Sequence, residues 1–571
     1  MQNRRILWMV LFVFYGLYLK AQEYKSGVTK NYLIQNVWLT ASPGAAPVLT
    51  SVKVRDGIIE EIGPGIKPGF DYKIIKADSQ YVYAGFIDAM SHTGIKKEED
   101  KKETPKLPSR GLANYEQSGI TPQNNALVAI KPKDSSIADL RKTGFVLSHV
   151  FPRGRMIAGN STLITLNEAE HEDRLVVKNN VAMQASFTPA NGASPSTVIG
   201  VIARFKEFYQ NTGLAIDNDA RFAKQNFGLK KPEFVEEWQA MAPVFKKQMP
   251  LYFVTPKSKD VFRAVELQKG MGFQMVLADV QHLQPAIDKV KAGGYVVLLS
   301  PQLPEEQKDE KKEKGDKKEK EGQATAETGK EEAGKTNPRT EEEMGLEKRK
   351  KEKWQEYMAQ AALLEKNNIS FAFSMANAKP TDFLKSIRAM KKAGLSEKAA
   401  LSALTTTPAT LLQIAGQYGT LEKGKVASMV FFDKSVWDEK AIIKQVMVDG
   451  QMYVNEEKSK SEGKPGDGLK LEGEWSYTVD VQGQVETGRF KFVKDGKGYS
   501  GTSTSDANES TPMEDLIIDG NKVTFKLMIN SGQPTQIMVE LTFTNDNYTG
   551  NATIGEAGSF VVKGSKTNGP K

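Results

Sequence analysis

Alternating hydrophobic and polar positions predict two strand-rich zones on either side of a mixed zone. Residues 32–39 and 51–55 have the short apolar or alternating pattern of strands, and the Asp56-Gly57 dipeptide after them is typical of a hairpin turn. From 80 to 300, apolar runs of strand length alternate with amphipathic stretches. Strands that alternate with helices predict a parallel sheet, open or closed into a barrel.

Helices are predicted where the apolar spacing becomes that of a helix face. These stretches are 258–270, 284–292, 357–366 and 396–409, and Ser396 is expected as the N-cap of the last one. Short strands return at 418–455.

Two zones depart from this pattern. Residues 303–353 are rich in lysine and glutamate and cannot bury a core, so we expect a charged, disordered insertion that is helical only near its end. A docking arm for a partner is the functional alternative for this insertion. Residues 470–571 alternate between turn dipeptides such as Asp495-Gly496, which predicts an antiparallel β-barrel or β-sandwich.

The amino terminus has the pattern of a signal peptide. Arg4 and Arg5 precede the apolar run 6–19, and Ala21 is a small residue at a suitable cleavage point. The run is shorter than the roughly 20 apolar residues of a membrane span. We therefore expect an exported protein, periplasmic or secreted, without a stable membrane anchor after cleavage; an uncleaved anchor is the alternative.

Composition narrows the chemistry. The net charge is +8 over 571 residues, and no basic block has interleaved aromatic residues, so we expect no nucleic-acid binding. The chain has no cysteine, which excludes a disulfide framework, a thiolate nucleophile and Cys-ligated zinc. Its four histidines leave little material for a histidine-rich metal centre; they are His92, His149, His171 and His282.

Three stretches carry a family signature when taken together. Residues 54–64 form the hairpin Val-Arg-Asp-Gly-Ile-Ile-Glu-Glu-Ile-Gly-Pro, residues 83–88 read Tyr-Ala-Gly-Phe-Ile-Asp, and residues 394–450 combine Gly-Leu-Ser, Thr-Pro-Ala and Gly-Thr-Leu-Glu-Lys-Gly-Lys-Val-Ala. In this order and spacing they resemble the amidohydrolase superfamily, nearest to its imidazolonepropionase- and dipeptidase-like members. The resemblance implies a (β/α)8 TIM-like barrel with a composite β-sandwich from the flanking segments.

The expected domains follow from these zones. They are a signal peptide at 1–22, the first part of the sandwich at 23–85, the barrel at 86–415 with the insertion 303–353, the second part of the sandwich at 416–456, a linker at 457–469 and the all-β domain at 470–571.

The resemblance also implies a metal site, which polarises the scissile carbonyl and activates water. Its ligands lie at the carboxyl ends of the barrel strands: His-x-His on strand one, often a carboxylated lysine on strand four, a histidine each on strands five and six, and an aspartate on strand eight.

Most of these ligand positions hold other residues. Strand one reads Asp-Ala-Met-Ser-His at 88–92, so Met90 stands at the first histidine position and only His92 remains. Thr255 stands at the strand-five position and Met375 at the strand-eight aspartate position, while strands four and six offer no lysine and no histidine. A thioether is a poor ligand for zinc or manganese. We therefore expect a barrel whose metal centre is lost.

Other residues are candidates for contacts at the barrel mouth. His149 lies at a strand end, and Arg153 and Arg155 lie in the loop after it, where paired arginines can bind a carboxylate or phosphate. The structural alternatives are that His149 is only a hydrogen-bonded histidine at a strand end, and that the two arginines lie on a solvated loop. The competing hypothesis of a rebuilt metal site uses His92 and His149 together with Asp279 and His282.

The favoured hypothesis is a non-catalytic partner or scaffold, without a cofactor, that pairs with an active amidohydrolase homologue or with itself. Two alternatives stay open. One is an active amidohydrolase that hydrolyses C–N bonds with zinc or another divalent ion at a reduced or atypical site. The other is a protein that binds a small-molecule ligand in the barrel mouth or the C-terminal domain.

Overall fold

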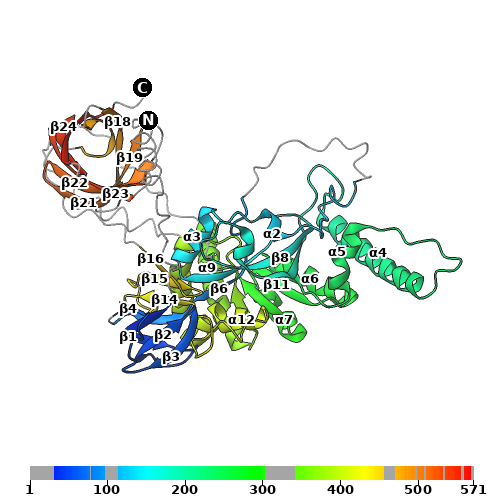
Figure 1. Cartoon of the computed structure of the whole chain (residues 1–571). Coiled ribbons are helices and arrows are strands. Elements are labelled where there is room, and N and C mark those ends of the chain that lie inside the picture. Colours follow the sequence, from blue (N-terminus) through cyan, green and yellow to red (C-terminus); the bar gives the residue numbers. More distant parts are fainter. Residues whose placement is uncertain are drawn as a thin grey trace, which may run out of the picture. The chain divides into compact units, whose positions relative to one another are not determined.

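The computed structural model describes two compact units, residues 1–455 and 456–571 (Figure 1). Within residues 31–567, the gaps in the described chain are 78, 97–112, 303–340, 456–469, 482–483, 496–497, 507–509, 531–533, 545 and 555–557. The predicted signal peptide 1–22, most of the insertion 303–353 and the linker 457–469 therefore lie outside the described residues. No helix of the described chain combines the length and apolar character needed to cross a bilayer.

The two segments that flank the barrel share one eight-stranded sheet, in the order β16-β15-β14-β5-β1-β2-β3, with β4 paired to β1. The strands before the barrel are β1 (Tyr32–Thr40), β2 (Val48–Arg55), β3 (Ile58–Gly63), β4 (Lys73–Lys76) and β5 (Tyr81–Ala84); those after it are β14 (Met429–Phe432), β15 (Ile443–Val448) and β16 (Gln451–Val454). Antiparallel pairing of β14 with β5 joins the two segments. The predicted Asp56-Gly57 turn links β2 to β3, and both of its residues have positive φ, as a type I′ turn requires.

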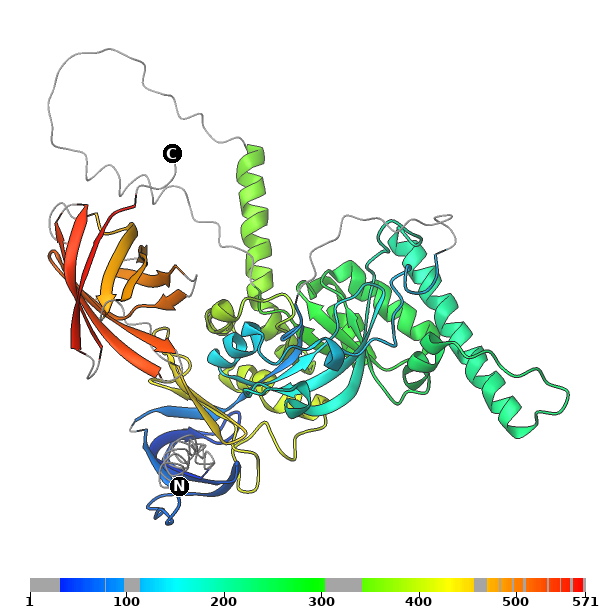
Figure 2. The ribbon, with the colours of Figure 1, turned by 45° about the horizontal axis from the view of Figure 1, so that its top comes forward.

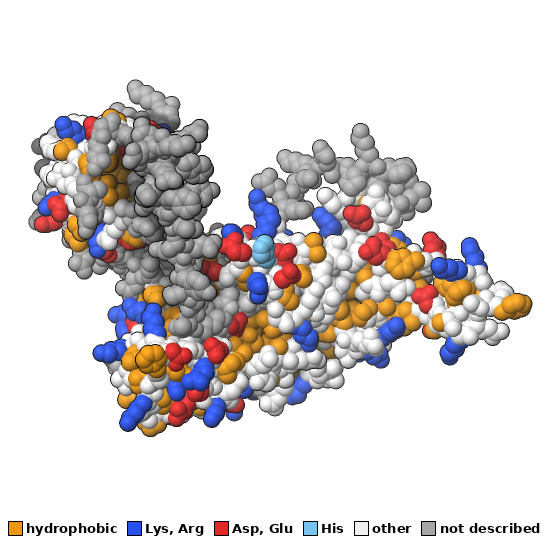
Figure 3. Space-filling view, viewed as in Figure 1, with side chains coloured by type: hydrophobic (Ala, Val, Ile, Leu, Met, Phe, Trp, Pro, Cys, Tyr) orange, Lys and Arg blue, Asp and Glu red, His pale blue; other side chains and the backbone are white. Residues whose placement is uncertain are grey.

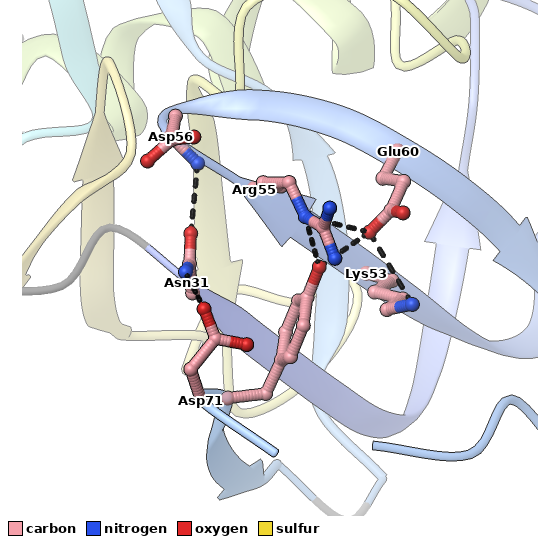
Figure 4. A network of polar contacts seen from close by, with 7 residues as sticks. Asn31, Lys53, Arg55, Asp56, Glu60 and Asp71 are labelled. Carbon is pink, nitrogen blue, oxygen red and sulfur yellow. Dashed lines mark hydrogen bonds and ion pairs between the residues drawn. The ribbon is translucent and has the colours of Figure 1, made fainter. Parts of the chain in front are cut away.

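A polar network fastens the loop before β4 onto this sheet (Figure 4). The Tyr72 hydroxyl donates to Glu60 Oε2 and accepts from Arg55 Nε, both at 2.6 Å. Lys53 reaches the same Glu60 oxygen at 3.3 Å. The hydrogen bond from Tyr72 is the main reason that the pKa of Glu60 is lowered. Because these side chains bond to one another, we assign the network a structural role.

The barrel is a second eight-stranded sheet, in the order β13-β12-β11-β10-β9-β8-β7-β6. Its strands are β6 (Phe86–Ser91), β7 (Phe145–Val150), β8 (Ile157–Thr165), β9 (Val176–Ser186), β10 (Leu251–Val254), β11 (Met275–Val280), β12 (Val296–Leu299) and β13 (Phe371–Phe373). Just after β13, the Met375 amide donates to Met90 O at 2.8 Å, so the last strand meets the first and the sheet nearly closes. The predicted α/β barrel is confirmed.

One barrel strand departs from the (β/α)8 pattern. Strand β8 runs antiparallel to both of its neighbours, β7 and β9. Only residues 151–156 connect β7 to β8, whereas a parallel crossover needs a dozen or more residues. This part of the barrel is therefore a hairpin without a covering helix between its strands.

The helices lie around the barrel and include one long projecting pair (Figure 2). They are α2 (Ala126–Ala129), α3 (Ser135–Lys142), α4 (Val198–Lys224), α5 (Glu236–Phe245), α6 (Ser258–Met271), α7 (Ile287–Gly293), α9 (Glu341–Lys366), α10 (Phe383–Lys392), α11 (Glu397–Leu404) and α12 (Thr406–Leu411). Helix α9 begins well before the predicted 357–366, so the end of the charged segment is helical. Ser396 caps α11 as predicted, because its Oγ accepts from Ala399 N at 3.1 Å.

The C-terminal unit is an all-antiparallel nine-stranded sheet, in the order β20-β19-β18-β17-β25-β24-β23-β22-β21. Its strands are β17 (Gly473–Val481), β18 (Gln484–Asp495), β19 (Gly498–Ser505), β20 (Ser510–Pro512), β21 (Glu514–Asp519), β22 (Lys522–Asn530), β23 (Pro534–Thr544), β24 (Asn547–Ile554) and β25 (Gly558–Ser565). Strands from the two ends of this order also contact each other, so the sheet curls into a barrel. Its buried core is rich in aromatic residues, including Trp475, Phe490, Phe525 and Phe543.

Candidate functional site

Asp88 anchors the junction between the first and last barrel strands. It is fully buried on β6, and its Oδ1 accepts from the Met90 and Met375 amides, both at 3.1 Å. Its Oδ2 accepts from Ser148 Oγ at 2.7 Å. Burial raises the pKa of Asp88 to about 6, although these hydrogen bonds oppose the rise. The carboxyl group therefore ties three strand ends together.

The three predicted ligand-loss positions are all buried at the carboxyl ends of their strands. Met90 and Met375 are 1% and 6% exposed, and Thr255 directly follows β10 with no exposed surface. The Thr255 hydroxyl has no hydrogen-bond partner among the described residues. Thioether sulfur and a neutral hydroxyl are weak ligands for a hard or borderline divalent ion.

His149 is enclosed within the barrel. Its Nδ1 lies 3.1 Å from Ala89 O, which can only accept, so Nδ1 carries the proton; its Nε2 lies 2.6 Å from Ser161 Oγ. The ring centroid is 4.5 Å from that of Phe151 and 5.2 Å from that of Tyr252 on β10. Burial lowers the pKa of His149 to about 3, so the ring is neutral. Both nitrogens are engaged, which makes His149 a packed, hydrogen-bonded residue in this structure.

His92 is half-buried just after β6. Its Nδ1 donates to Phe151 O at 2.8 Å, so Nε2 is the nitrogen left to accept. Burial and, to a smaller extent, the positive charge of Arg153 lower the pKa of His92 to about 4. Arg153 itself is exposed, whereas Arg155 donates to Pro189 O at 2.8 Å. The two arginines therefore differ in environment, and only Arg153 influences a histidine of the barrel mouth.

The other two histidines lie elsewhere. His171 is exposed before a short 3-10 turn. His282 is half-buried, 3.6 Å from Glu356 Oε2 of α9, and its ring centroid is 5.4 Å from that of Tyr357. Helix α9 therefore partly covers the ring of His282.

Asp279 is the acidic group of the barrel mouth. It is 1% exposed near the end of β11, where its Oδ2 accepts from Asn377 Nδ2 at 2.6 Å and its Oδ1 from Ser374 Oγ at 3.3 Å. Burial raises the pKa of Asp279, and the two hydrogen bonds oppose that rise. Asp279 lines a pocket of about 630 Å³ at the carboxyl ends of β10 to β13.

The barrel interior is apolar and well filled. Side chains from six of the eight strands meet there with Phe151, which follows β7: Ala89, Met90, Ala182, Tyr252, Val276, Ala278, Leu298 and Ala372. A metal centre needs water-filled space among its ligands. In this barrel, large side chains such as Tyr252 fill that space. This packing favours a closed core over a reaction chamber.

These residues do not fit the divalent centre that the sequence resemblance implies. A catalytic zinc takes three protein ligands and keeps one position open. Among the described residues, no three His, Asp or Glu side chains lie close enough together to hold a metal ion. His92 offers one nitrogen, and Asp279 is already held by Ser374 and Asn377.

Comparison with known proteins gives a family match over part of the chain. The model of the Amidohydrolase family matches residues 355–453, which include the end of the barrel and the return to the first sheet. This part of the chain is similar to the amidohydrolases. A search of curated proteins gives no match.

One solved structure supports the fold, and two others are similar to a lesser degree. An amidohydrolase from Thermotoga maritima MSB8 superposes with a TM-score of 0.57 and 19% sequence identity, covering 74% of this chain and 100% of that chain. A Xaa-Pro dipeptidase with bound methionine gives 0.41 and 14%, covering 74% and 100%. A β-aspartyl dipeptidase from Fervidobacterium islandicum AW-1 gives 0.38 and 12%, covering 75% and 97%. The first similarity supports the barrel fold of this chain.

Sequence reasoning missed most of the mouth pocket. Besides Asp279, its polar lining includes Gln281, Gln302, Asn377 and Tyr357. Gln281, Gln302 and Asn377 each come within a few residues after a buried strand, which is where barrel proteins place functional groups. That position was the available signal; Tyr357, by contrast, comes from α9 and could not be placed without the fold.

Proposed function

We propose that this chain is an exported, non-catalytic partner or scaffold. The observation that carries the proposal is the donor set at the carboxyl ends of the strands: Met90, Thr255 and Met375 stand where the resemblance implies ligands. Their burial supports it, because a protein that keeps thioethers in these places gains core packing instead of metal affinity. Similarity to amidohydrolases alone would favour hydrolysis of C–N bonds, and the donor set is the observation that supports a non-catalytic role instead.

Metal analysis tests this proposal. We expect the purified mature protein to hold only substoichiometric zinc, manganese, iron or cobalt by mass spectrometry, and to leave dipeptides unhydrolysed after incubation with each ion. A metal-containing amidohydrolase purified in parallel is the control. One tightly bound divalent ion per chain contradicts the proposal, and loss of that ion in His92→Ala would establish the alternative of an atypical active site.

Export is supported by the amino-terminal pattern of Arg4, Arg5 and the apolar run 6–19. We expect the protein recovered from a bacterial host's periplasm to begin near residue 22. Intact-mass measurement of the periplasmic and membrane fractions checks this. Recovery of the full-length chain in the membrane would instead support an uncleaved anchor.

An exposed apolar surface supports a scaffolding role. Helix α4, the connection 225–235 and α5 form an arm that projects from the barrel (Figure 2), and hydrophobic side chains lie along it (Figure 3). Leu214, Phe227 and Phe234 are 67%, 90% and 76% exposed. Contiguous exposed hydrophobic side chains of this size mark interaction sites.

The charges of this arm favour a second copy of the chain as the occupant. Basic residues predominate toward its tip, where Arg221, Lys224, Lys230 and Lys231 accompany Glu233. Acidic residues predominate farther back, in the stem, where Glu207, Asp217, Asp219, Glu236 and Glu237 accompany Arg204 and Lys206. Gln239 donates to Asp219 at 2.9 Å, which places the acidic parts of α4 and α5 at one level. Two arms that cross antiparallel would therefore bring each basic tip against the other acidic stem, as a two-fold interface requires.

Replacing Phe227 and Phe234 by serine is expected to weaken this dimer. Anchor residues of this kind contribute about 2 kcal/mol or more each, so each substitution should raise the dimer Kd roughly 30-fold. Analytical ultracentrifugation measures the change. Ile199→Ser is the matched control, since Ile199 is 81% exposed but lies at the other end of α4. A wild-type protein that stays monomeric, or that uses the arm only for a different protein, contradicts self-association.

A further inference from the structure

The strand that carries Asp279 is locally distorted at that residue. The pairing of β11 with β12 shifts register between Leu277 and Val280, which marks a bulge. Asp279 lies inside this bulge with φ of +49°, a left-handed conformation that is unfavourable for a non-glycine residue. Bulges of this kind redirect a side chain and are common beside functional sites.

The distortion places a carboxylate in the wall of a pocket. Asn377 and Ser374, both just after β13, each donate one hydrogen bond to Asp279. A carboxylate has about four lone-pair positions, so roughly two remain for a further donor. The two known donors hold the group in place without neutralising its charge.

The rest of the pocket suits a small molecule with a cationic end. Among the described lining residues, Asp279 is the only one with a charged side chain; the other polar lining groups are amides and a phenol. Val254 and Pro256 supply apolar lining, and Tyr357 adds an aromatic side chain, a residue type that attracts cations. Between those two apolar residues, the buried Thr255 hydroxyl lacks a partner among the described residues. A volume of about 630 Å³ lies within the range of small-molecule sites.

We propose that this pocket binds a small organic cation, an ammonium group on a compact apolar body, through the carboxylate of Asp279. The ammonium donates its hydrogen bonds to the carboxylate oxygens, and the apolar body lies against Val254 and Pro256. Charge-assisted hydrogen bonds of this kind are about twice as strong as neutral ones. This binding role goes beyond the proposed scaffold function, which requires no ligand.

Calorimetry on the full chain with two matched probes tests the proposal. Benzylamine and benzyl alcohol share a ring and differ in charge. We expect saturable binding of benzylamine and at least about tenfold weaker binding of benzyl alcohol, the difference that one charge-assisted contact supplies. Equal affinity for the two probes, or no saturable binding of benzylamine, overturns the proposal.

Two variants locate the binding. Asp279→Asn should weaken benzylamine about tenfold and leave benzyl alcohol unchanged. Gln302→Lys, at an exposed lining residue, should weaken benzylamine by repulsion even if Asp279→Asn fails to fold. Asp139→Asn, an exposed carboxylate on α3, is the control and should bind as the wild type does. Unchanged benzylamine affinity in Gln302→Lys and in a folded Asp279→Asn rejects this site. None of these outcomes depends on metal content, so they are separable from the test of the scaffold role.

Discussion

The buried His149 is expected to lower the stability of the barrel as the pH drops below about 6.5, and His149→Gln should remove that contribution. The folded-state pKa of His149 is about 3, against 6.5 for an exposed histidine. Between these values the unfolded chain binds a proton that the folded chain does not, so acid favours unfolding. One such group gives a slope of about 1.4 kcal/mol per pH unit.

Three other buried groups shape the same curve. His92, with a pKa of about 4, acts in the same direction as His149 down to that pH. Asp88 acts in the opposite direction, because its pKa is raised from 3.8 to about 6 and the folded chain binds the extra proton in that window. Asp279, whose pKa is also raised by burial, acts in the same direction as Asp88. The wild-type slope is the sum of these effects, so only the difference between variant and wild type isolates His149.

Urea unfolding at several pH values between 7.5 and 4.5, values chosen to span most of the interval from 6.5 toward 3, measures that difference. The slope for His149→Gln should be shallower by about 1.4 kcal/mol per pH unit, whatever the stability lost at neutral pH. His171→Gln, at the exposed histidine, is the control. Parallel curves for His149→Gln and the wild type would show that His149 is not held neutral.

Much of the fold was readable because local signals agreed with one another. The Asp56-Gly57 turn and the N-cap Ser396 each appeared where the pattern predicted them, and the first barrel strand appeared where the resemblance implied it. The antiparallel strand β8 was missed because a buried strand shows the same apolar pattern in either direction. The short connection 151–156 was the signal for an antiparallel strand, since no crossover helix fits within it.

The candidate site was harder to predict because it is assembled from strand ends far apart in sequence. The ligand-loss positions could be found from the resemblance alone, yet the way the space is filled could not. Phe151 and Tyr252 come from different strands, and their ring centroids are 5.2 Å apart. The sequence around Asp279 also does not predict its left-handed backbone conformation, because that conformation depends on the register of β11 against β12.

The residues at the expected ligand positions and the close packing of the barrel interior have one physical explanation. A water-filled metal centre needs polar ligands around an open volume, whereas a stable barrel core needs close packing. Met90 lies in the same buried cluster as Phe151 and Tyr252. Flexible methionine fills irregular gaps well, so it suits a position where a ligand would otherwise leave space. The proposed loss of catalysis would thus stabilise the scaffold that remains.

Trp475→Ala is expected to destabilise the C-terminal unit by about 3–5 kcal/mol. Trp475 has no exposed surface, its indole nitrogen donates to Leu471 O at 2.9 Å, and its ring meets Phe543 edge to face at 4.8 Å. Truncation removes these contacts, leaves a large cavity and deprives a buried carbonyl of its donor. The exposed Val485→Ala, on β18 of the same unit, is the matched control.

Hydrogen exchange followed by mass spectrometry distinguishes the two units in this variant. Protection should fall throughout 470–567 and stay unchanged over the barrel, because the core around Trp475 shares no residue with the barrel core. A cooperative unit loses protection as a whole when its core is weakened. If the barrel peptides lost protection to the same extent, the two units would have to unfold together, and the C-terminal β-barrel would be part of the scaffold's stability instead of a separately stable module.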